Sequence, residues 1–369
     1  MTTQPAIDVA ILGYGRFGRA LGQLFAEAGV SLRAHDPQAD VPAEVRADSP
    51  AELVRGARFV VVSVPVPRIR AALHDLAPHL AKDGSQIVLD VGSVKVGPSA
   101  ALGEVLGASV PWVATHPLFG PLSLALAERP LRVVLCPAPA TFGPSHATAA
   151  ASVRALYERI DCEVIEQTAE SHDRVMAHTH ALTFFVAKGM IDAGAGMEVP
   201  FAPPSFQAIA RAIETVRSDA GHLFSAIARD NPFAAEARKQ LVQALSSIDR
   251  ALDAQSASPA GESGDAAPDS AGRFVIPDLG DRSPELKEAR EHIDRVDRDI
   301  VRLLAQRAQL SLRAARAKAR LGAPVLDSSR ETEVMGARRA WAEELKLDED
   351  AVADVFRAIM TMSRRAQRT

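Results

Sequence analysis

The chain has 369 residues, of which 47% are hydrophobic and 24% are charged, and its formal net charge is −4. This length is too great for one ordinary hydrophobic core and indicates two or three domains, while the small charge excess gives no reason to expect binding to nucleic acid. Apolar runs stay below the roughly 20 residues of a membrane helix, so we expect a multidomain protein that does not bind a membrane. A signal-peptide pattern is missing, and the cysteines are Cys136 and Cys162. We therefore expect a cytoplasmic protein with reduced thiols.

The first part of the chain alternates strand and helix patterns. Residues 8 to about 140 contain short runs rich in Val, Ile and Leu, separated by helical periodicities. This is the signature of a parallel sheet covered by helices on both faces, so residues 1–145 are predicted to form a doubly wound α/β domain. From 146 to 252, strand patterns fade after CEVIEQ and long Ala- and Leu-rich stretches predict a helical second domain.

The last third begins with a stretch that lacks the large apolar residues of a core. Residues 253–282 are rich in Ala, Ser, Pro, Gly and Asp, which predicts a flexible linker. After it, Ser283 and Pro284 are typical of a helix start. Apolar residues then recur every seven positions, so 283–369 are predicted to form a helical domain with one long helix, 284–321, and two shorter ones beyond Pro324.

A glycine-rich turn follows the first apolar strand and opens a helical stretch. The turn comprises Gly13, Tyr14, Gly15, Arg16, Phe17 and Gly18. In this context G-x-G-x-x-G predicts a dinucleotide pyrophosphate site, the alternative being a glycine-rich turn of another α/β protein. Asp36 ends the second strand and is placed to bind the ribose hydroxyls, which favours NAD over NADP, although Arg33 and His35 nearby leave the choice slightly open. Ser63 and Pro65, after the run FVVV, complete the predicted cofactor contacts.

Candidate catalytic residues follow two later strands. Ser93 and Lys95 come after QIVLD, and His116 comes after WVA. Ligands of open α/β sheets bind beyond the carboxyl ends of the strands, and a neutral imidazole is suited to receive a hydroxyl proton during hydride transfer. A turn-stabilising role for His116 before Pro117 is the alternative on these residues alone.

Three stretches, DVGSVKVGP, THPLFGP and ESHDRVMAHTHALTFF, resemble the prephenate dehydrogenase family, particularly its bifunctional T-protein branch, over about residues 8–245. The resemblance implies that NAD accepts a hydride from the ring carbon that bears the hydroxyl, while the ring carboxylate leaves as CO₂ and 4-hydroxyphenylpyruvate forms. It also implies that His116 is the catalytic hydrogen-bond acceptor, that Ser93 supports the nicotinamide and His116, and that Lys95 places positive charge near the substrate.

The resemblance has one departure, in the helix that anchors the substrate. Gln207 and Thr215 stand where the T-protein branch has two arginines, and Arg211 and Arg217 on the same predicted helix are the candidate replacements. Because THPLFGP and ETVRSD also resemble arogenate dehydrogenases, arogenate stays open as the substrate.

Three histidines lie close together in the stretch ESHDRVMAHTHALTFF, and we expect no metal there. These are His172, His178 and His180, which lack acidic or Cys partners at ligand spacing apart from Asp173, and the resembling family uses no metal.

Arg307 falls on the apolar seven-residue stripe of the long C-terminal helix. A buried arginine needs an anionic partner. Lys318, eleven residues later, lies near the same face, whereas Arg290 points about 100° away, so a pocket built from all three cations would need a second copy of the helix. A solvated face with extended side chains is the alternative on these residues alone.

Residues 284–369 as a whole resemble the all-helical chorismate mutase family, an intertwined dimer. The positions that match its polar active-site residues are Arg290, Arg307, Lys318, Asp327, Arg330, Glu331, Ser363 and Gln367. The resemblance implies that Arg290, from the partner subunit, and Arg307 clamp the two carboxylates of chorismate, while Lys318, Gln367 and Glu331 act at the ether oxygen. Asp327 and Ser363 would hold hydroxyl or backbone contacts, and Arg330 would order the site.

The combined prediction is a multidomain, homodimeric enzyme with an α/β Rossmann domain, an all-α dehydrogenase dimerisation domain and a three-helix chorismate mutase domain. It would convert chorismate to prephenate and then oxidise prephenate with NAD. The alternatives are an arogenate dehydrogenase with a working mutase, a C-terminal dimerisation or regulatory module without catalysis, and an unrelated Rossmann reductase with an interaction domain.

Overall fold

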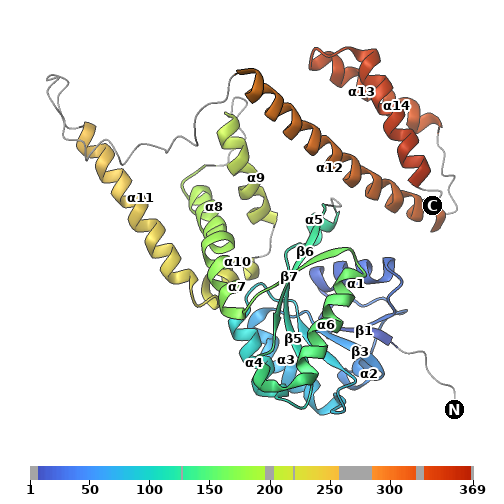
Figure 1. Ribbon diagram of the computed structural model, residues 1–369, viewed down its shortest axis with the longest axis vertical. Helices are drawn as coiled ribbons and strands as arrows, with labels where there is room; N and C mark the ends of the chain where they lie inside the picture. The colour runs from blue at the N-terminus through green and yellow to red at the C-terminus, as the bar shows by residue number, and fades with distance from the viewer. Residues whose placement is uncertain are drawn as a thin grey trace. The chain divides into compact units, whose positions relative to one another are not determined.

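The computed structural model describes residues 7–125, 128–195, 203–218, 221–256, 285–320 and 328–366 (Figure 1). The chain divides into two units, one made of residues 1–121 and 130–275 and the other of residues 122–129 and 276–369. Within the described ranges, no helix combines the length and the apolar character needed to cross a membrane.

The first unit contains a seven-stranded sheet in the order β2-β1-β3-β4-β5-β6-β7. The first five strands in this order, from β2 through β1 to β5, are parallel. Strand β6 runs antiparallel to β5, and β7 is parallel to β6. All residues of β4 and β5 are buried, as expected where helices cover both faces of a parallel sheet. The strands are β1 (Ile7–Leu12), β2 (Leu32–His35), β3 (Ala57–Val62), β4 (Ile87–Asp90), β5 (Trp112–Pro117), β6 (Leu131–Pro137) and β7 (Cys162–Glu166).

Helices and short 3₁₀ turns connect the strands of the sheet. A helix after a strand allows the chain to return to a parallel neighbour, which confirms the doubly wound α/β prediction. The helices are α1 (Arg16–Glu27), α2 (Pro50–Val54), α3 (Ile69–Leu76), α4 (Val96–Leu106), α5 (Pro121–Ala125) and α6 (Pro144–Glu158), and the 3₁₀ turns are η1 (Val66–Arg68), η2 (Ala77–His79) and η3 (Ala140–Phe142).

The predicted boundary at residue 145 is too early. Helix α6 packs on the sheet, where His146 lies 5.9 Å from the ring of Trp112, and β7 hydrogen-bonds with β6. The α/β domain therefore continues to Glu166. The partner of a strand is set by tertiary contacts, so CEVIEQ by itself did not reveal that it completes the sheet.

Beyond β7 the first unit becomes helical, as predicted, and these helices rise from one end of the sheet (Figure 1). A small core of alanines, including Ala177, Ala181 and Ala234, allows the helices to approach closely. The elements are α7 (Ala169–Met176), the π-helical turn η4 (Ala177–Ala181), α8 (Leu182–Asp192), α9 (Pro204–Ser218), α10 (Gly221–Ser225), the π-helical turn η5 (Ala226–Asp230) and α11 (Ala234–Ser256).

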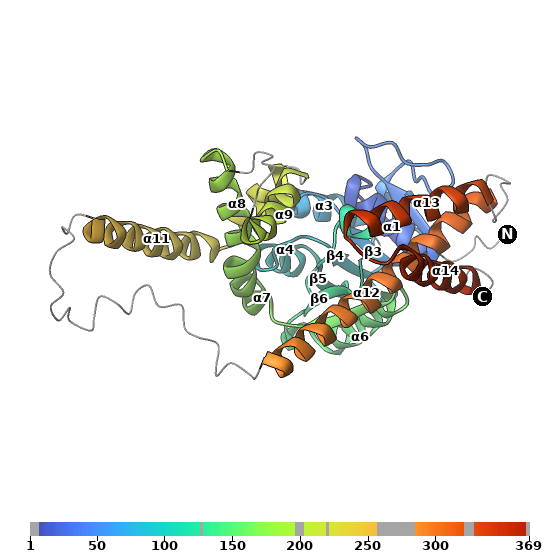
Figure 2. The same cartoon turned by 90° about the horizontal axis from the view of Figure 1, so that it is seen from above.

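The second unit contains the predicted long helix and two shorter ones: α12 (Glu285–Arg320), α13 (Ser328–Glu344) and α14 (Glu349–Ala366) (Figure 2). The alanines Ala342 and Ala353 are buried between the shorter helices. Helix α11 extends to residue 256, past the predicted linker start at 253, and the rest of the predicted linker lies outside the described residues.

Candidate active sites

The glycine-rich turn forms a cradle between the carboxyl ends of β1 and β3. Gly13 has a φ of +93°, and a Cβ there would lie 2.3 Å from the carbonyl oxygen of Ser63. A Cβ on Gly18 would lie 2.1 Å from the carbonyl oxygen of Gly13, whereas one on Gly15 would meet nothing within 4 Å. Two glycines therefore close the turn tightly, and the third leaves open space in front of the α1 N-terminus. This geometry fits a dinucleotide pyrophosphate, because β1 and β3 lie at the switch point of the sheet.

Asp36 links this turn to the end of β2. Its carboxylate accepts the backbone N–H groups of Tyr14 (2.7 Å), Gln38 (2.8 Å) and Ala39 (3.0 Å). Burial acts to raise the pKa of Asp36, but these donors outweigh burial and leave the pKa lowered. An ionised carboxylate here suits the ribose hydroxyls of NAD and repels a 2′-phosphate.

The other predicted cofactor residues take different positions around the cradle. The ring of Tyr14 is buried beneath α1, so Tyr14 contributes its backbone N–H, while Arg16 is exposed. Phe17 lies 6.2 Å from the ring of Phe119, which follows β5. Ser63 is half-buried, and Pro65 is exposed.

His116 lies within β5 rather than after it. The pairing of β5 with β4 ends at Ala114, but β5 continues to Pro117, where His116 pairs with Val134 of β6. This strand holds the imidazole rigidly, with 4% of the residue exposed. Burial lowers the pKa of His116 well below its usual value, and the charge of Lys95 lowers it further. His116 is therefore a neutral imidazole at neutral pH.

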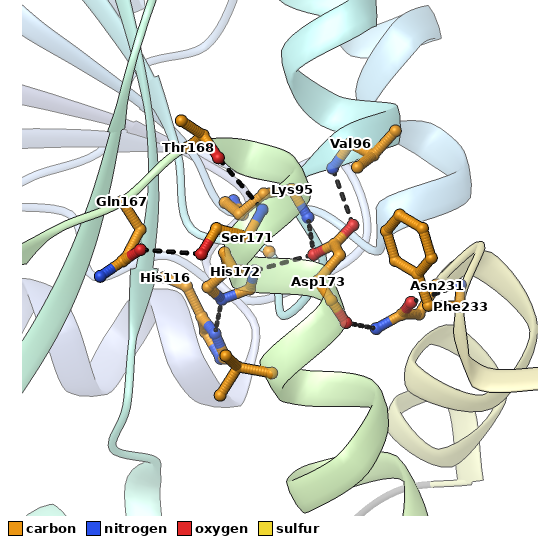
Figure 3. A network of polar contacts seen from close by, with 12 residues as sticks. Lys95, Val96, His116, Gln167, Thr168, Ser171, His172, Asp173, Asn231 and Phe233 are labelled. Atoms are coloured by element: carbon orange, nitrogen blue, oxygen red, sulfur yellow. Dashed lines mark hydrogen bonds and ion pairs between the residues drawn. The ribbon is translucent and has the colours of Figure 1, made fainter. Parts of the chain in front are cut away.

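A buried chain of hydrogen bonds extends from His116 into α7 (Figure 3). His116 Nδ1 lies 2.8 Å from His172 Nε2, and His172 Nδ1 lies 2.7 Å from Asp173 Oδ1. The two oxygens of Asp173 accept the backbone N–H groups of Lys95 (2.7 Å) and Val96 (2.8 Å) at the start of α4. Asp173 therefore connects the first turn of α4 to the histidine pair.

Local structure in α7 places His172 and Asp173. Thr168 caps the helix by accepting the N–H of Ser171 (3.1 Å), so residues 172 and 173 fall on the next turn (Figure 3). Asn231 donates its amide to the carbonyl oxygen of Asp173 (2.8 Å) and holds that turn from the opposite side. The sequence pointed to His172 only as one of three neighbouring histidines where no metal is expected. The adjacent His and Asp in ESHDR were the signal available for this network.

Lys95, which the resemblance places near the substrate as a positive charge, lies in a buried ion pair. Its side chain is 0% exposed, and its ammonium donates to Asp90 Oδ2 (2.5 Å) and to the carbonyl oxygen of Thr115 (2.5 Å). Burial raises the pKa of Asp90, and Lys95 opposes this rise. The ammonium thus neutralises a buried carboxylate and ties the end of β4 to β5, and its charge acts on the neighbouring His116. A sequence cannot show this, because strand-end lysines are usually exposed.

The remaining predicted dehydrogenase residues take separate positions. Ser93 is half-buried in the turn between β4 and α4. His180 stacks on His116 with ring centroids 6.3 Å apart, whereas His178 is exposed. Arg217 is exposed on α9, and the side chain of Arg211 lies outside the described parts. Among the described residues, no cluster of three or more His, Cys, Asp or Glu side chains could hold a metal ion.

In the second unit, the structure brings two predicted mutase residues together. Arg307 of α12 donates to Ser363 Oγ of α14 (2.5 Å), and Ser363 is 6% exposed. Burial lowers the pKa of Arg307, with a smaller effect of the neighbouring cation Arg338. Lys318 is half-buried on the same helix. Asp327 and Gln367, and the side chains of Arg290, Arg330 and Glu331, lie outside the described residues.

Arg338 was missed by sequence reasoning. Its guanidinium lies 4.5 Å from the ring centroid of Trp341 and 5.4 Å from that of Phe356. The contact with Trp341 lies within α13, and the contact with Phe356 joins α13 to α14. The spacing of three residues between Arg338 and Trp341 on one helix was the available signal.

Two family models match separate parts of the chain. Residues 18–165 match "Prephenate dehydrogenase, nucleotide-binding domain", and residues 289–368 match "Chorismate mutase type II". The first match ends within β7, in agreement with the corrected domain boundary.

Curated relatives divide in the same way. Arogenate dehydrogenase 2 of Arabidopsis thaliana is 24% identical over 253 residues, which are 67% of this chain and 70% of that protein. The T-protein of Enterobacter agglomerans is 37% identical over 79 residues, 21% of each chain. The chorismate mutase of Methanocaldococcus jannaschii is 30% identical over 84 residues, 23% of this chain and 85% of that protein.

Solved structures resemble the first unit. Prephenate dehydrogenase from A. aeolicus, in complex with hydroxyphenyl propionate and NAD⁺, has a TM-score of 0.53 at 20% identity and covers 69% of this chain and 93% of its own. Synechocystis arogenate dehydrogenase has a TM-score of 0.53 at 19% identity and covers 68% and 94%. At this identity the likeness concerns the fold.

Proposed function

We propose that this chain, which belongs to the chorismate mutase family in its C-terminal helices and resembles prephenate dehydrogenases in its nucleotide-binding domain, catalyses two consecutive steps of tyrosine biosynthesis. The first converts chorismate to prephenate, and the second oxidises prephenate with NAD⁺ to 4-hydroxyphenylpyruvate and CO₂. The observation that carries the dehydrogenase assignment is the buried, neutral His116 at a sheet end whose switch point holds the glycine cradle.

In the dehydrogenase site, NAD⁺ supplies the hydride acceptor when bound. Gly13, Gly15 and Gly18 would hold its pyrophosphate, and Asp36 its ribose. His116 would accept a hydrogen bond from the ring hydroxyl as the hydride leaves the same carbon and the carboxylate leaves as CO₂. Aromatisation drives the reaction, so the protein mainly positions and polarises the substrate.

In the mutase site, the chemistry needs no nucleophile or cofactor, only a cationic pocket that holds the reactive conformer. Arg307, fixed by Ser363 and partly desolvated, would bind one carboxylate of chorismate. Lys318 would donate to the ether oxygen from the same helix. The roles of Arg290, Asp327, Arg330, Glu331 and Gln367 remain proposals that rest on the family positions.

A homodimer in the cytoplasm is part of the proposal. One apolar stripe of α12 is exposed within a single chain, with 48–62% exposure at Ile293, Val296, Ile300 and Leu303. Such a stripe with seven-residue spacing is typical of a helix that packs against a second helix. Analytical ultracentrifugation of the full chain tests this point, and a monomer at micromolar concentration would contradict it.

The central experiment is NADH formation by the purified protein given chorismate and NAD⁺, with prephenate and arogenate as parallel substrates. NADH from chorismate requires both activities in sequence. Oxidation of arogenate but not of prephenate would replace the proposed substrate, and oxidation of prephenate without turnover of chorismate would leave the helical domain as a non-catalytic module.

A further inference from the structure

The hydrogen bonds around Asp173 determine where the hydrogens of His172 lie. Both carboxylate oxygens of Asp173 accept backbone N–H groups, so the carboxylate is an acceptor toward His172 Nδ1 at 2.7 Å. His172 Nδ1 must therefore carry the hydrogen. A neutral imidazole has one N–H, so His172 Nε2 is left as an acceptor.

The position of the hydrogen on His172 determines the position of the hydrogen on His116. Its Nδ1 lies 2.8 Å from His172 Nε2, and one of the two nitrogens must donate. Since His172 Nε2 accepts, His116 Nδ1 donates, and His116 Nε2 keeps a lone pair. The opposite tautomer of His116 would require His172 Nε2–H. That hydrogen would either leave a bare His172 Nδ1 against the carboxylate of Asp173, two acceptors 2.7 Å apart, or make His172 a doubly protonated, charged ring in a position that is only 2% exposed.

We propose that His172 and Asp173 are positioning residues that hold His116 in the Nδ1–H tautomer, so that Nε2 is the acceptor for the ring hydroxyl of the substrate. The inference rests on the proposed dehydrogenase activity and deepens it. In the step, the C–H bond at the hydroxyl-bearing carbon breaks as hydride to NAD⁺, and the bond to the carboxylate breaks with its electron pair entering the ring. The hydroxyl proton is shared with His116 Nε2 and stays with the phenol product.

Burial restricts His116, His172 and Asp173 to the hydrogen bonds that they make with one another and with the surrounding protein. His116, His172 and Asp173 are 4%, 2% and 0% exposed, so bulk water does not substitute for a missing partner. The other charged or titratable groups that face His116 are Lys95, which is paired with Asp90, and His180, whose ring stacks on His116. Among these groups, His172 is the hydrogen-bond partner of His116 Nδ1.

The test compares two replacements of His172 in the full-length protein. His172→Gln keeps an amide oxygen that can accept the His116 Nδ1–H, whereas His172→Leu removes the acceptor. We expect H172L to lower kcat of prephenate oxidation by at least ~100-fold, the usual scale of a misplaced acid–base group, and H172Q to stay within about 10-fold of wild type. The KM values for prephenate and NAD⁺ should change little in both.

Two controls separate positioning from loss of fold. His178→Leu alters an exposed histidine on the adjacent turn and should match wild type. NAD⁺ binding, which depends on the glycine cradle, should persist in every variant. Wild-type kcat in H172L would overturn the proposal, and so would an equal loss in H172Q and H172L with NAD⁺ binding intact.

A readout independent of turnover is ¹⁵N NMR of histidine-labelled protein, with the His116 signals assigned by their absence in His116→Gln. A protonated Nδ1 and an unprotonated Nε2 in wild type, changed in H172L, are expected. An Nε2–H tautomer would overturn the proposal. If the protein oxidises neither prephenate nor arogenate while NMR finds the Nδ1–H form, the proposed activity fails and the tautomer assignment stands.

Discussion

Replacing Lys95 with methionine leaves the carboxylate of Asp90 buried without its counter-charge. Both side chains are 0% exposed, and the ammonium also donates to the Thr115 carbonyl. Breaking a buried ion pair by removing one partner costs about 3–5 kcal/mol, whereas replacing both partners by apolar groups is often close to neutral. We therefore expect K95M to destabilise the first unit by about 3–5 kcal/mol and the double variant K95M/D90L to recover part of this loss.

The stability that K95M loses relative to wild type should be smaller at acidic pH. Burial already raises the pKa of Asp90, and without Lys95 that pKa rises further. A group whose pKa is higher in the folded state destabilises the fold as pH rises toward the folded value, because ionisation then favours the unfolded chain. K95M should thus be closer to wild type at pH 5 than at pH 7.

Tryptophan fluorescence during urea unfolding provides the assay. The chain has two tryptophans, Trp112 in β5 and Trp341 in α13, so a Trp341→Phe background reports on the sheet alone. In that background, a K95M loss below about 1 kcal/mol at pH 7 would refute the structural role of Lys95. Retained stability with a raised KM for prephenate would instead favour the predicted role of Lys95 as a positive charge near the substrate.

Four further outcomes are expected. The kcat/KM of prephenate oxidation should stay on its plateau as pH falls to 6.5, because burial lowers the pKa of His116 below that value and the neutral form is the active one. A decrease of kcat/KM on the acid side with its midpoint above pH 6.5 would contradict this. Arg307→Lys should lower mutase kcat/KM by about 10–150-fold, the equivalent of a charge-assisted hydrogen bond, and leave prephenate oxidation unchanged, as measured by chorismate consumption and NADH formation. Ser363→Ala removes the hydrogen bond that orients Arg307 and should cost about 2–10-fold in the same mutase assay; no change would separate Ser363 from the site. Asp36→Ser should lower the preference for NAD⁺ over NADP⁺ by at least ~10-fold in kcat/KM, and an unchanged ratio would show that another residue selects the cofactor.

Local patterns were enough to predict the cofactor site and the helical domain. The glycine turn, its strand and Asp36 all fall within about 30 residues, and strand, turn and helix follow one another directly along the chain. The apolar repeat of α12 likewise appears in consecutive turns of one helix. In both places the interactions that define the feature join residues close in sequence, so the amino-acid order determines it.

Contacts between distant segments decided the rest. His116 meets His172 across 56 residues, and the backbone of Lys95 meets Asp173 across 78. Whether Lys95 is exposed or pairs with a buried carboxylate, and whether β7 joins the sheet, depends on what packs beside each segment. The sequence alone identified the chemistry of these side chains, while the tertiary structure decided their partners, because burial and hydrogen bonding are set by neighbours that no local pattern specifies.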